Sequence, residues 1–464
     1  MSQSLSSLEF SVLPLQKSLL DNLGTLGYHQ MTDIQAQSLP LFLKGRDVIG
    51  QAKTGSGKTA SFGLGLLQKL DVKKFRVQSL VLCPTRELAD QVAKEIRKLA
   101  RSIHNIKVLT LCGGMPMGPQ IGSLEHGAHI IVGTPGRIQD HLSKGRLTLK
   151  HLNTLVLDEA DRMLEMGFQD ALDAIIKHCP KQRQTLLFSA TFQENIEKIA
   201  TRYLNQPAHI KVESVHQEAS IEQAFYHVDT NEDRIDALQR LLLAHKPNAA
   251  IIFCNTKKAV KEVAMQLQTS GHSVLALHGD LEQRERNETL LKFANKSALI
   301  LVATDVAARG LDIDNLDAVI NYDITPDPEV HVHRIGRTGR AGNKGIACSI
   351  YCDKDSRRIA DIETYLKKDI NVLALPDDNV FSERPKKPTM TTLQIDGGKK
   401  QKLRPGDILG GLTGKKGIQG SQVGKINIFD VKAYVAVDSK VVKAAMKKIS
   451  NDKLKGRNFR VRAI

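Results

Sequence analysis

The sequence predicts an α/β protein in which two tandem parallel-sheet domains precede a small α+β domain. Short, wholly apolar runs alternate with helical patterns along residues 1–375, which is typical of parallel strands buried on both faces. A stretch rich in proline and charge, 376–390, then interrupts the pattern, and residues 391–464 follow a βαββαβ order. These observations together define the fold class.

Length and composition agree with this division. The chain has 464 residues, of which 41% are hydrophobic, enough to bury two substantial cores. We expect the first domain to span 1–207, with Gln206-Pro207 and the polar stretch after it as a connector. The second domain should span 208–375, followed by a linker at 376–390 and a C-terminal domain at 391–464.

A glycine-rich turn lies between a strand predicted at 47–49 and a helix predicted at 60–70. It consists of Ala52, Lys53, Thr54, Gly55, Ser56, Gly57, Lys58 and Thr59. Backbone N–H groups of such a turn, and the positive end of the following helix, can hold phosphate groups. Lys58 would neutralise the outer phosphates and Thr59 would hold a metal ion. Ala52 stands where the general phosphate-loop pattern has glycine.

Acidic residues follow another predicted strand, 155–157. Because the carboxyl ends of parallel strands meet at one edge of a sheet, Asp158 and Glu159 should face the phosphate turn. Asp158 would bind Mg²⁺ through water, and Glu159 would polarise the attacking water. The sequence therefore predicts hydrolysis of a nucleoside triphosphate.

Further strands continue the pattern. The strand predicted at 185–188 is followed by Ser189-Ala190-Thr191. The second half repeats the architecture without a phosphate loop of its own. Its predicted strands are 249–253, 274–277, 299–302 and 318–320.

Over about residues 8–375 the chain resembles the DEAD-box RNA helicases, a family named for the four residues 158–161. The resemblance implies two RecA-like domains that share one nucleotide, ATP with Mg²⁺, at their interface. In the segment that resembles the adenine-reading Q motif, Thr32 and Gln35 would lie near the base. Phe10 resembles the upstream aromatic residue that stacks on it.

The resemblance also implies contacts with RNA. These would be made by Thr85, Arg86, Gly114, Thr134, Gly136 and Arg137 in the first domain and by Gln283, Arg286 and Thr304 in the second. Asp312 would reach the ribose. Arg337 and Arg340 resemble arginine fingers, whose planar guanidinium groups stabilise charge on the transferred phosphoryl group. Since Lys58 lies in the other domain, hydrolysis would depend on domain closure.

The C-terminal part carries most of the positive charge. Residues 381–464 contain 20 Lys+Arg and 6 Asp+Glu, which leaves +14 of the chain's net +16. A small basic module attached to an ATPase suggests an RNA anchor that localises the motor by effective concentration. A disordered basic tail is the alternative, although the regular pattern favours a folded domain.

That pattern is the topology of an RNA recognition motif. Its strands are predicted at 392–395, 424–429, 432–437 and 458–463, and its helices near 405–412 and at 440–449. Of the positions that usually stack bases, only Tyr434 is aromatic, while Gln394 and Lys432 occupy others. Basic edges should therefore read folded RNA. These edges include Lys415, Lys416, Lys425, Lys453, Lys455, Arg457 and Arg460.

A DEAD-box core joined to this divergent module resembles the bacterial DbpA subfamily. The most specific sequence segments of the match are Gly397-Gly398-Lys399-Lys400 and Arg404-Pro405-Gly406-Asp407-Ile408. The resemblance implies that residues 391–464 bind a hairpin of 23S ribosomal RNA. It also implies a role in assembly of the large ribosomal subunit, with the pre-ribosomal particle as partner.

Neither the cysteines nor the apolar segments of the sequence indicate a further function. The 6 cysteines show no C-x-x-C spacing, and neither a leader nor an apolar run of membrane length is present, so we expect a cytoplasmic enzyme without a membrane partner. Two other functional classes are compatible with the sequence. The chain could be an ATP-gated RNA clamp that does not unwind productively, or a motor acting on DNA, although we expect no DNA partner.

Overall fold

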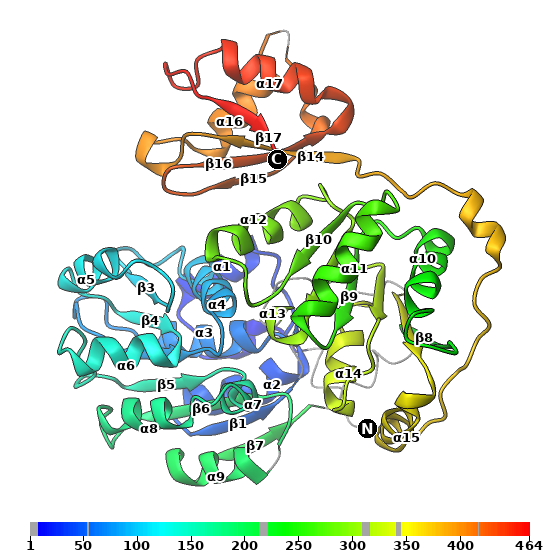
Figure 1. Cartoon of the computed structure of the whole chain (residues 1–464). Coiled ribbons are helices and arrows are strands. Elements are labelled where there is room, and N and C mark those ends of the chain that lie inside the picture. The colour runs from blue at the N-terminus through cyan, green and yellow to red at the C-terminus, as the bar shows by residue number, and fades with distance from the viewer. Residues whose placement is uncertain are drawn as a thin grey trace. The chain divides into compact units, whose positions relative to one another are not determined.

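The computed structural model describes residues 8–52, 55–192, 194–212, 221–308, 316–339, 345–415 and 417–464. The described chain divides into two compact units, the first ending at residue 212 and the second beginning at 221. Two parallel sheets and one small antiparallel sheet confirm the predicted fold class (Figure 1).

The first unit is built on a seven-stranded parallel sheet in the order β3-β4-β2-β5-β6-β1-β7. Its strands are β1 (Val48–Gln51), β2 (Ser79–Leu82), β3 (Val108–Leu111), β4 (Ile130–Gly133), β5 (Thr154–Leu157), β6 (Gln184–Ser189) and β7 (Ala208–Lys211). Helices cover both of its faces (Figure 1).

Alternating side chains of each strand enter two different cores. In β5, Leu155 and Leu157 enter one core, and Val156 enters the other. The Val156 core contains residues of α1 (Lys17–Thr25), α2 (Asp33–Leu43), α3 (Lys58–Gln68) and α4 (Arg86–Leu99). The opposite core contains residues of α6 (Pro135–Ser143), α7 (Ala160–Glu165), α8 (Gln169–Lys177) and α9 (Glu194–Tyr203). Burial on both faces explains why these strands are apolar throughout.

The first sheet extends beyond the boundary expected at residue 207. Strand β7 pairs in parallel with β1, with Ala208 opposite Val48, so residues 208–211 belong to the first unit. Only Ile210 in this edge strand is buried. Because the other three residues meet solvent to varying degrees, the segment looks like a polar connector in the sequence.

The second unit contains a six-stranded sheet in the order β10-β11-β9-β12-β13-β8. Its strands are β8 (Ile221–His227), β9 (Ala250–Cys254), β10 (Val274–Leu277), β11 (Ile300–Thr304), β12 (Ala318–Asn321) and β13 (Gly345–Tyr351). Its helices are α10 (Arg234–His245), α11 (Lys257–Thr269), α12 (Gln283–Ala294), α13 (Asp305–Ala308), α14 (Pro328–Ile335) and α15 (Ser356–Leu366). The sequence did not single out β8 and β13.

The expected linker forms an ordered strap. Asp378–Ser382 make a 3-10 helix that packs against α10 (Figure 1). The Arg240 guanidinium of α10 donates to Pro376 O at 3.2 Å, pairs with the Asp378 carboxylate and lies 5.5 Å from the centroid of the Phe381 ring. Lys246 pairs with Glu383 at 2.8 Å. The strap is therefore fastened along its length.

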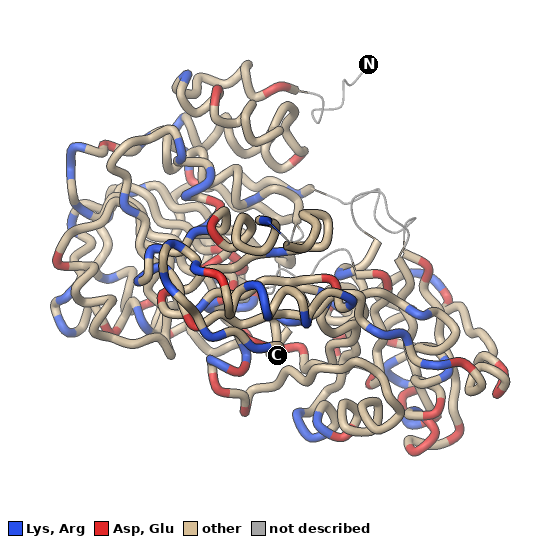
Figure 2. Tube along the Cα trace, turned by 90° about the horizontal axis from the view of Figure 1, so that it is seen from above, with Lys and Arg blue, Asp and Glu red and all other residues tan. Residues whose placement is uncertain are grey.

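The C-terminal domain has the predicted βαββαβ order. Its antiparallel sheet has the order β15-β16-β14-β17, and its elements are β14 (Met390–Ile395), α16 (Pro405–Thr413), β15 (Val423–Ile428), β16 (Ala433–Asp438), α17 (Val442–Asn451) and β17 (Val461–Ala463). One face packs on both helices through residues such as Leu393, Val435 and Ile449. Lysine and arginine recur along this part of the tube (Figure 2).

Thr392, on the other face of this sheet, contacts the segment that follows α12. Its hydroxyl accepts a hydrogen bond from Asn295 Nδ2 at 3.1 Å and lies 2.6 Å from Ser297 Oγ. Thr392 is fully buried. Together with the strap, these bonds join the C-terminal domain to the preceding sheet domain within the second unit.

Candidate nucleotide and RNA sites

Most of the predicted first-domain residues lie at the carboxyl edge of its sheet. The phosphate turn follows β1, Ser189 ends β6, and Asp158 follows β5. These three strands are neighbours. Predicted RNA-binding residues follow β2, β3 and β4, which are neighbours on the other side of β5. The strand order therefore places the nucleotide motifs and the RNA motifs in two adjoining halves of one edge.

Two glycines shape the phosphate turn. Gly55 has φ +84° and Gly57 has φ +96°, a region that residues with a Cβ rarely adopt. Gly57 is the N-cap of α3, so Lys58 and Thr59 are the first residues of the helix. The turn therefore aims the positive end of α3 at the space above the strand ends.

Lys58 is held inside the turn. Its side chain is 6% exposed, and its Nζ donates to Ala52 O at 2.9 Å. Ala52, at the position where the general pattern has glycine, is itself buried. The backbone carbonyl of Ala52 thus positions the ammonium group at the base of the turn.

The Q-motif residues lie directly against the phosphate turn. Gln35 Nε2 donates to Gly57 O at 3.1 Å, and Gln35 Oε1 accepts from Thr32 N at 2.9 Å. A Cβ on Gly57 would lie only 2.5 Å from Gln35 Nε2 and 2.9 Å from Thr32 Oγ1. Residues at the N-terminus of α2 therefore pack against the phosphate turn and hold Gly57 in place.

Phe10 lies elsewhere than a stacking role would suggest. Its side chain is 3% exposed and belongs to the core packed against α1 to α4. The neighbouring backbone pairs with the start of the Q-motif segment, since Met31 N donates to Leu8 O at 2.9 Å. In this arrangement the ring anchors that segment and presents little surface to a base.

Asp158 is buried beside the phosphate turn. It is 2% exposed, and its Oδ1 has no hydrogen-bond partner among the described residues. Burial raises the pKa of this carboxyl group to about 6, although the Lys58 charge opposes the shift. An orphaned carboxylate oxygen beside the phosphate turn, near the Lys58 charge, fits the oxygen ligands of a nucleotide-bound Mg²⁺ ion.

Asp161 fixes the acidic motif, a role that its sequence position does not reveal. Its Oδ2 accepts from Ala190 N at 3.0 Å and from Thr191 N at 3.2 Å. This carboxylate therefore links the acidic motif to the Ser-Ala-Thr segment across two strand ends. Glu159, two residues earlier, has φ +54°, a strained conformation for a residue with a side chain. The only sequence signal for Asp161 was its membership of the same acidic run.

Arg86 and Gly114 are in contact at the carboxyl ends of β2 and β3, where predicted RNA-binding residues lie. Thr85 is the N-cap of α4, and its hydroxyl accepts from Leu88 N at 3.3 Å. A Cβ on Gly114 would lie 2.2 Å from Arg86 Nη1, so the guanidinium packs directly on the glycine backbone. Gly114 also has φ +67°. Both features require glycine at this position.

Thr134 joins the next two strand ends. Its hydroxyl accepts from Gly113 N at 3.2 Å, and it is the N-cap of α6. Gly136 is exposed in the first turn of that helix. Arg137 donates to Met115 O at 3.1 Å. The first-domain residues with predicted RNA contacts thus form a continuous network around the N-termini of α4 and α6, where phosphate groups bind favourably.

Predicted RNA contacts of the second unit also cluster. Arg286 of α12 donates to Ala307 O at 2.6 Å. Thr304, at the end of β11, accepts from Ala307 N at 3.3 Å and so caps α13. Gln283 is the first residue of α12 and donates to Asn287 Oδ1 at 2.8 Å. The structure brings the N-terminus of α12 and the end of β11 together.

Arg334 is a structural residue whose role is not evident from the sequence. It is 1% exposed, and its guanidinium pairs with the Asp305 carboxylate through two bonds of 2.7 Å. It also donates to Asp323 O at 2.7 Å and to Asn255 Oδ1 at 2.8 Å. This network fixes α14 to three strand ends. Arg337, two residues after the end of the same helix, is partly exposed.

Four candidate site residues lie outside the described residues. They are Lys53, Thr54, Asp312 and Arg340. Lys416 of the predicted basic edges is outside them as well.

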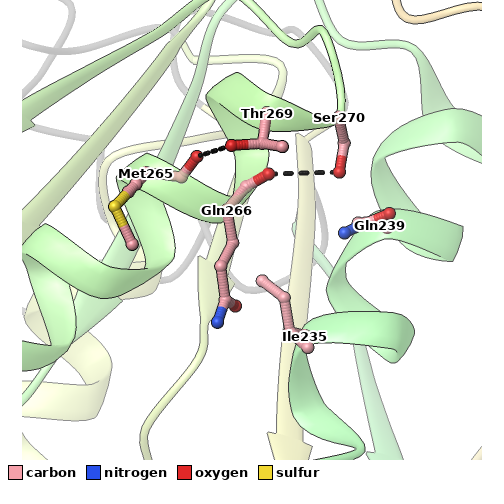
Figure 3. Close-up of a pocket in the computed structure, with 6 residues that line it drawn as sticks. All are labelled: Ile235, Gln239, Met265, Gln266, Thr269 and Ser270. Carbon is pink, nitrogen blue, oxygen red and sulfur yellow. Dashed lines mark hydrogen bonds between the residues drawn. The ribbon is translucent and has the colours of Figure 1, made fainter.

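A cavity of about 320 Å³ between α10 and α11 lies apart from these motifs (Figure 3). It is lined by Ile235, Gln239, Met265, Gln266, Thr269 and Ser270. The Thr269 hydroxyl donates to Met265 O at 3.0 Å and that of Ser270 to Gln266 O at 3.1 Å. Both hydroxyls are bonded to backbone carbonyls of their own helical segment, so they are not directed at a ligand in this cavity.

Family models match three parts of the chain. Residues 32–199 match the DEAD/DEAH box helicase model, and residues 233–342 match the helicase conserved C-terminal domain. Residues 392–463 match the DbpA RNA binding domain. The matches cover the two parallel-sheet domains and the antiparallel domain described above.

Similar proteins agree with this assignment. The chain is 53% identical over 454 residues to the ATP-dependent RNA helicase DbpA of Escherichia coli, covering 98% of each chain. It is 44% identical to the DEAD-box ATP-dependent RNA helicase CshA of Geobacillus kaustophilus, covering 79% of this chain and 78% of that one. A structure of Saccharomyces cerevisiae Dbp5 bound to RNA and ADP BeF3 matches with a TM-score of 0.73 at 31% identity, covering 81% of this chain and 98% of that one.

This chain therefore belongs to the DEAD-box family of ATP-dependent RNA helicases and, within that family, to the DbpA subfamily. The predicted class of enzyme is confirmed. No helix in the described ranges is both long and apolar enough to cross a membrane.

Proposed function

We propose that this helicase separates short stretches of structured RNA, using Mg²⁺-ATP, and that residues 391–464 direct it to a hairpin of 23S ribosomal RNA during assembly of the large ribosomal subunit. The observation that carries the proposal is the edge of the first sheet, where nucleotide motifs and RNA motifs occupy adjoining strand ends. A protein with this edge can sense both ligands through one rigid element.

Nucleotide binding is assigned to the phosphate turn and its support. N–H groups of residues 55–59 and the N-terminus of α3 would hold the phosphates, with Lys58 against the outer ones. Asp158 and Thr59 would hold Mg²⁺, which when bound neutralises phosphate charge. Glu159 would orient the attacking water and accept its proton. Thr32 and Gln35 would read the adenine edge, because an amide bonds both a donor and an acceptor.

Closure of the two sheet domains completes the proposed mechanism. Arg337 and Arg340 would reach the transferred phosphoryl group from the second domain, and Asp312 would reach the ribose. The Arg334–Asp305 pair supports this assignment, because it gives the helix that ends before Arg337 a rigid base. RNA bound along both domains would favour the same closed form, and a bent strand in that form would be incompatible with a duplex.

Targeting is assigned to the C-terminal domain. Its match to the DbpA RNA binding domain and the net charge of +14 over residues 381–464 support an RNA anchor. The ordered strap supports an anchor with a restricted position rather than one on a free tether. The 6 free cysteines fit a reducing, cytoplasmic setting.

Duplex displacement measured beside ATP turnover tests the proposal. With a 23S ribosomal RNA fragment that carries the hairpin, the full chain should displace a neighbouring strand, and its ATPase should exceed that obtained with unrelated RNA. A chain lacking residues 391–464 should keep basal ATPase and lose this preference. ATP turnover without strand displacement would instead identify an RNA clamp. DNA of the same sequence should not stimulate turnover.

A further inference from the structure

We propose that two neighbouring turns of the C-terminal domain, residues 398–402 and 429–432, form a binding site for an unpaired nucleotide of RNA. The Phe429 ring would stack on the base, while Lys399 and Lys400 would contact the flanking phosphates. This inference rests on the proposed RNA-anchoring function, and it names the surface that performs it.

The sheet surface on which many small RNA-binding domains stack bases is poorly suited to that task here. One row across the four strands consists of Asn427, Tyr434, Gln394 and Arg462. Arg462 donates to Gln394 Oε1 at 3.2 Å, and Gln394 Nε2 donates to Asp396 Oδ1 at 2.9 Å. Tyr434 is only 8% exposed. Gln394 is therefore bonded to Arg462 and Asp396, and the aromatic ring of this row is covered.

Phe429 offers the exposed ring that the sheet surface lacks. It lies in the turn between β15 and β16 and is 45% exposed. Its ring packs nearly at right angles to Tyr434, with centroids 5.7 Å apart and an interplanar angle of 87°. Val431, two residues later, is 52% exposed. An aromatic ring that is held by a neighbour yet open to solvent is a suitable stacking platform for a base.

The second turn is fastened against the first. Lys399 N donates to Phe429 O, and Lys400 N donates to Asp430 O, both at 2.9 Å. Gly398 makes this approach possible, because a Cβ there would lie 2.1 Å from Phe429 O and 2.8 Å from Lys432 N. Gly397 is equally restricted, since its Cβ would lie 2.2 Å from the Phe459 ring. The Gly-Gly-Lys-Lys sequence thus places two lysines beside the exposed ring.

The positive charges of the 398–402 turn are suited to binding the phosphate backbone of RNA. Lys399 and Lys400 are both exposed, and within the described chain neither ammonium group has an acidic partner. Lys402 is exposed at the end of the same turn, and its carbonyl accepts a hydrogen bond from Lys455 at 2.8 Å. Lysines around one exposed aromatic ring combine phosphate attraction with base stacking, the pair of interactions that binds unpaired RNA.

Fluorescence anisotropy with the full chain tests this site. The probe is a labelled stem-loop RNA with unpaired loop residues, compared with a blunt duplex of the same stem. Phe429→Ala should weaken stem-loop binding about 10-fold, and Phe429→Trp should restore it. Duplex binding should change less than twofold. Leu409→Ala, which removes another 40% exposed apolar side chain from the same domain, is the matched control and should leave both affinities unchanged.

The lysines have a separate readout. Replacing both Lys399 and Lys400 by Gln should reduce the slope of log affinity against log salt by about 1.4, because two fewer phosphate contacts release fewer counterions. Equal affinities of Phe429→Ala and Leu409→Ala for the stem-loop would overturn the proposal, as would an unchanged salt slope. If the chain without residues 391–464 loses stem-loop binding but Phe429→Ala does not, only this site fails. If that truncated chain binds as tightly as the full chain, the anchoring function itself fails.

Discussion

Glu159 and Asp161 lie two residues apart but differ in what surrounds them. Asp161 accepts three hydrogen bonds from the 190–191 segment, so its carboxylate is committed to holding two strand ends together. Glu159 takes a left-handed backbone conformation at the N-cap of α7. Strain of this kind persists at residues whose position matters to function. At the residue scale, the acidic motif thus combines one positioning residue with one candidate base.

Glu159→Gln should abolish ATP turnover while leaving nucleotide and RNA binding intact. The amide keeps the shape of the side chain but cannot accept a proton from water. We expect a fall in kcat of at least about 100-fold with little change in nucleotide affinity. Glu125→Gln, an exposed residue at the end of α5 (Met117–Glu125), is the matched control. Near-normal hydrolysis by Glu159→Gln would refute the assigned role.

His331 should make the second sheet domain sensitive to acid. It is 1% exposed and stacks on Phe225, and burial together with the Arg334 charge lowers its pKa from 6.5 to about 4. Because the folded-state pKa is below the unfolded value, the stabilisation is complete above pH 6.5 and is lost as pH falls towards 4. The loss at pH 5 should be about 2 kcal/mol.

Urea denaturation at pH 7 and pH 5 checks this. His331→Phe keeps a ring against Phe225 and removes the titration, so its unfolding midpoint should fall less between the two values. Burial also lowers the pKa values of His245, His272 and His278, so some acid sensitivity should remain in the variant. Identical midpoint shifts in both proteins would show that His331 does not contribute.

At the element scale, the N-terminus of α2 and the phosphate turn behave as one unit. Gly57→Ala would place a Cβ 2.5 Å from Gln35 Nε2 in a backbone conformation that alanine disfavours. We expect loss of most nucleotide binding, by about 10-fold or more, because the turn must shift. Gly118→Ala on α5 meets no atom within 4 Å and should bind nucleotide normally. Normal nucleotide affinity of Gly57→Ala, measured by titration with a fluorescent ATP analogue, would contradict the account.

The strap between the sheet domain and the C-terminal domain makes a second element-scale prediction. Arg240→Ala removes its bonds to Pro376 and Asp378 and its contact with Phe381. Trypsin should then cut after Lys386 several-fold faster, since cleavage reports local opening and both Arg384 and Lys387 are protected by the proline that follows them. Lys258→Ala, which removes an exposed ion pair on α11, should leave the cleavage rate unchanged. A free linker would be cut at equal rates in all three proteins.

Apolar strands could be predicted from the sequence, and mixed ones could not. Strand β10 begins and ends where its pattern indicates, because its apolar run coincides with the paired residues. Strand β8 contains Glu222 and Gln223, and only three of its residues are buried, so its pattern resembles a surface segment. Helix α3 starts at Lys58 rather than at the expected residue 60, because the conformation of Gly57 sets its N-cap.

Within the candidate site, local motifs could be recognised but their partners could not. The phosphate turn and the acidic run are continuous in sequence, so spacing alone identifies them. Contacts such as Arg86 with Gly114 or Asp161 with Thr191 join residues far apart, and these pairings appear only once the strand order is known. The same holds for Phe429, whose exposure depends on how the β15–β16 turn meets the 398–402 turn.

At the scale of the whole molecule, we propose that two domains share one reaction. The first would supply the phosphate turn and the acidic motif, and the second would supply Arg337, which follows the helix fixed by Arg334. On this proposal, neither set should complete the chemistry alone. ATP and RNA should therefore stabilise the same closed form, and each should raise the affinity for the other by the same factor.

The most direct test is the affinity for single-stranded RNA measured with and without a saturating, non-hydrolysable ATP analogue. The account predicts that the analogue lowers the RNA Kd by about 10-fold or more, and that RNA lowers the Kd of the analogue by the same factor. An RNA Kd that does not change when the analogue is bound would contradict the central claim.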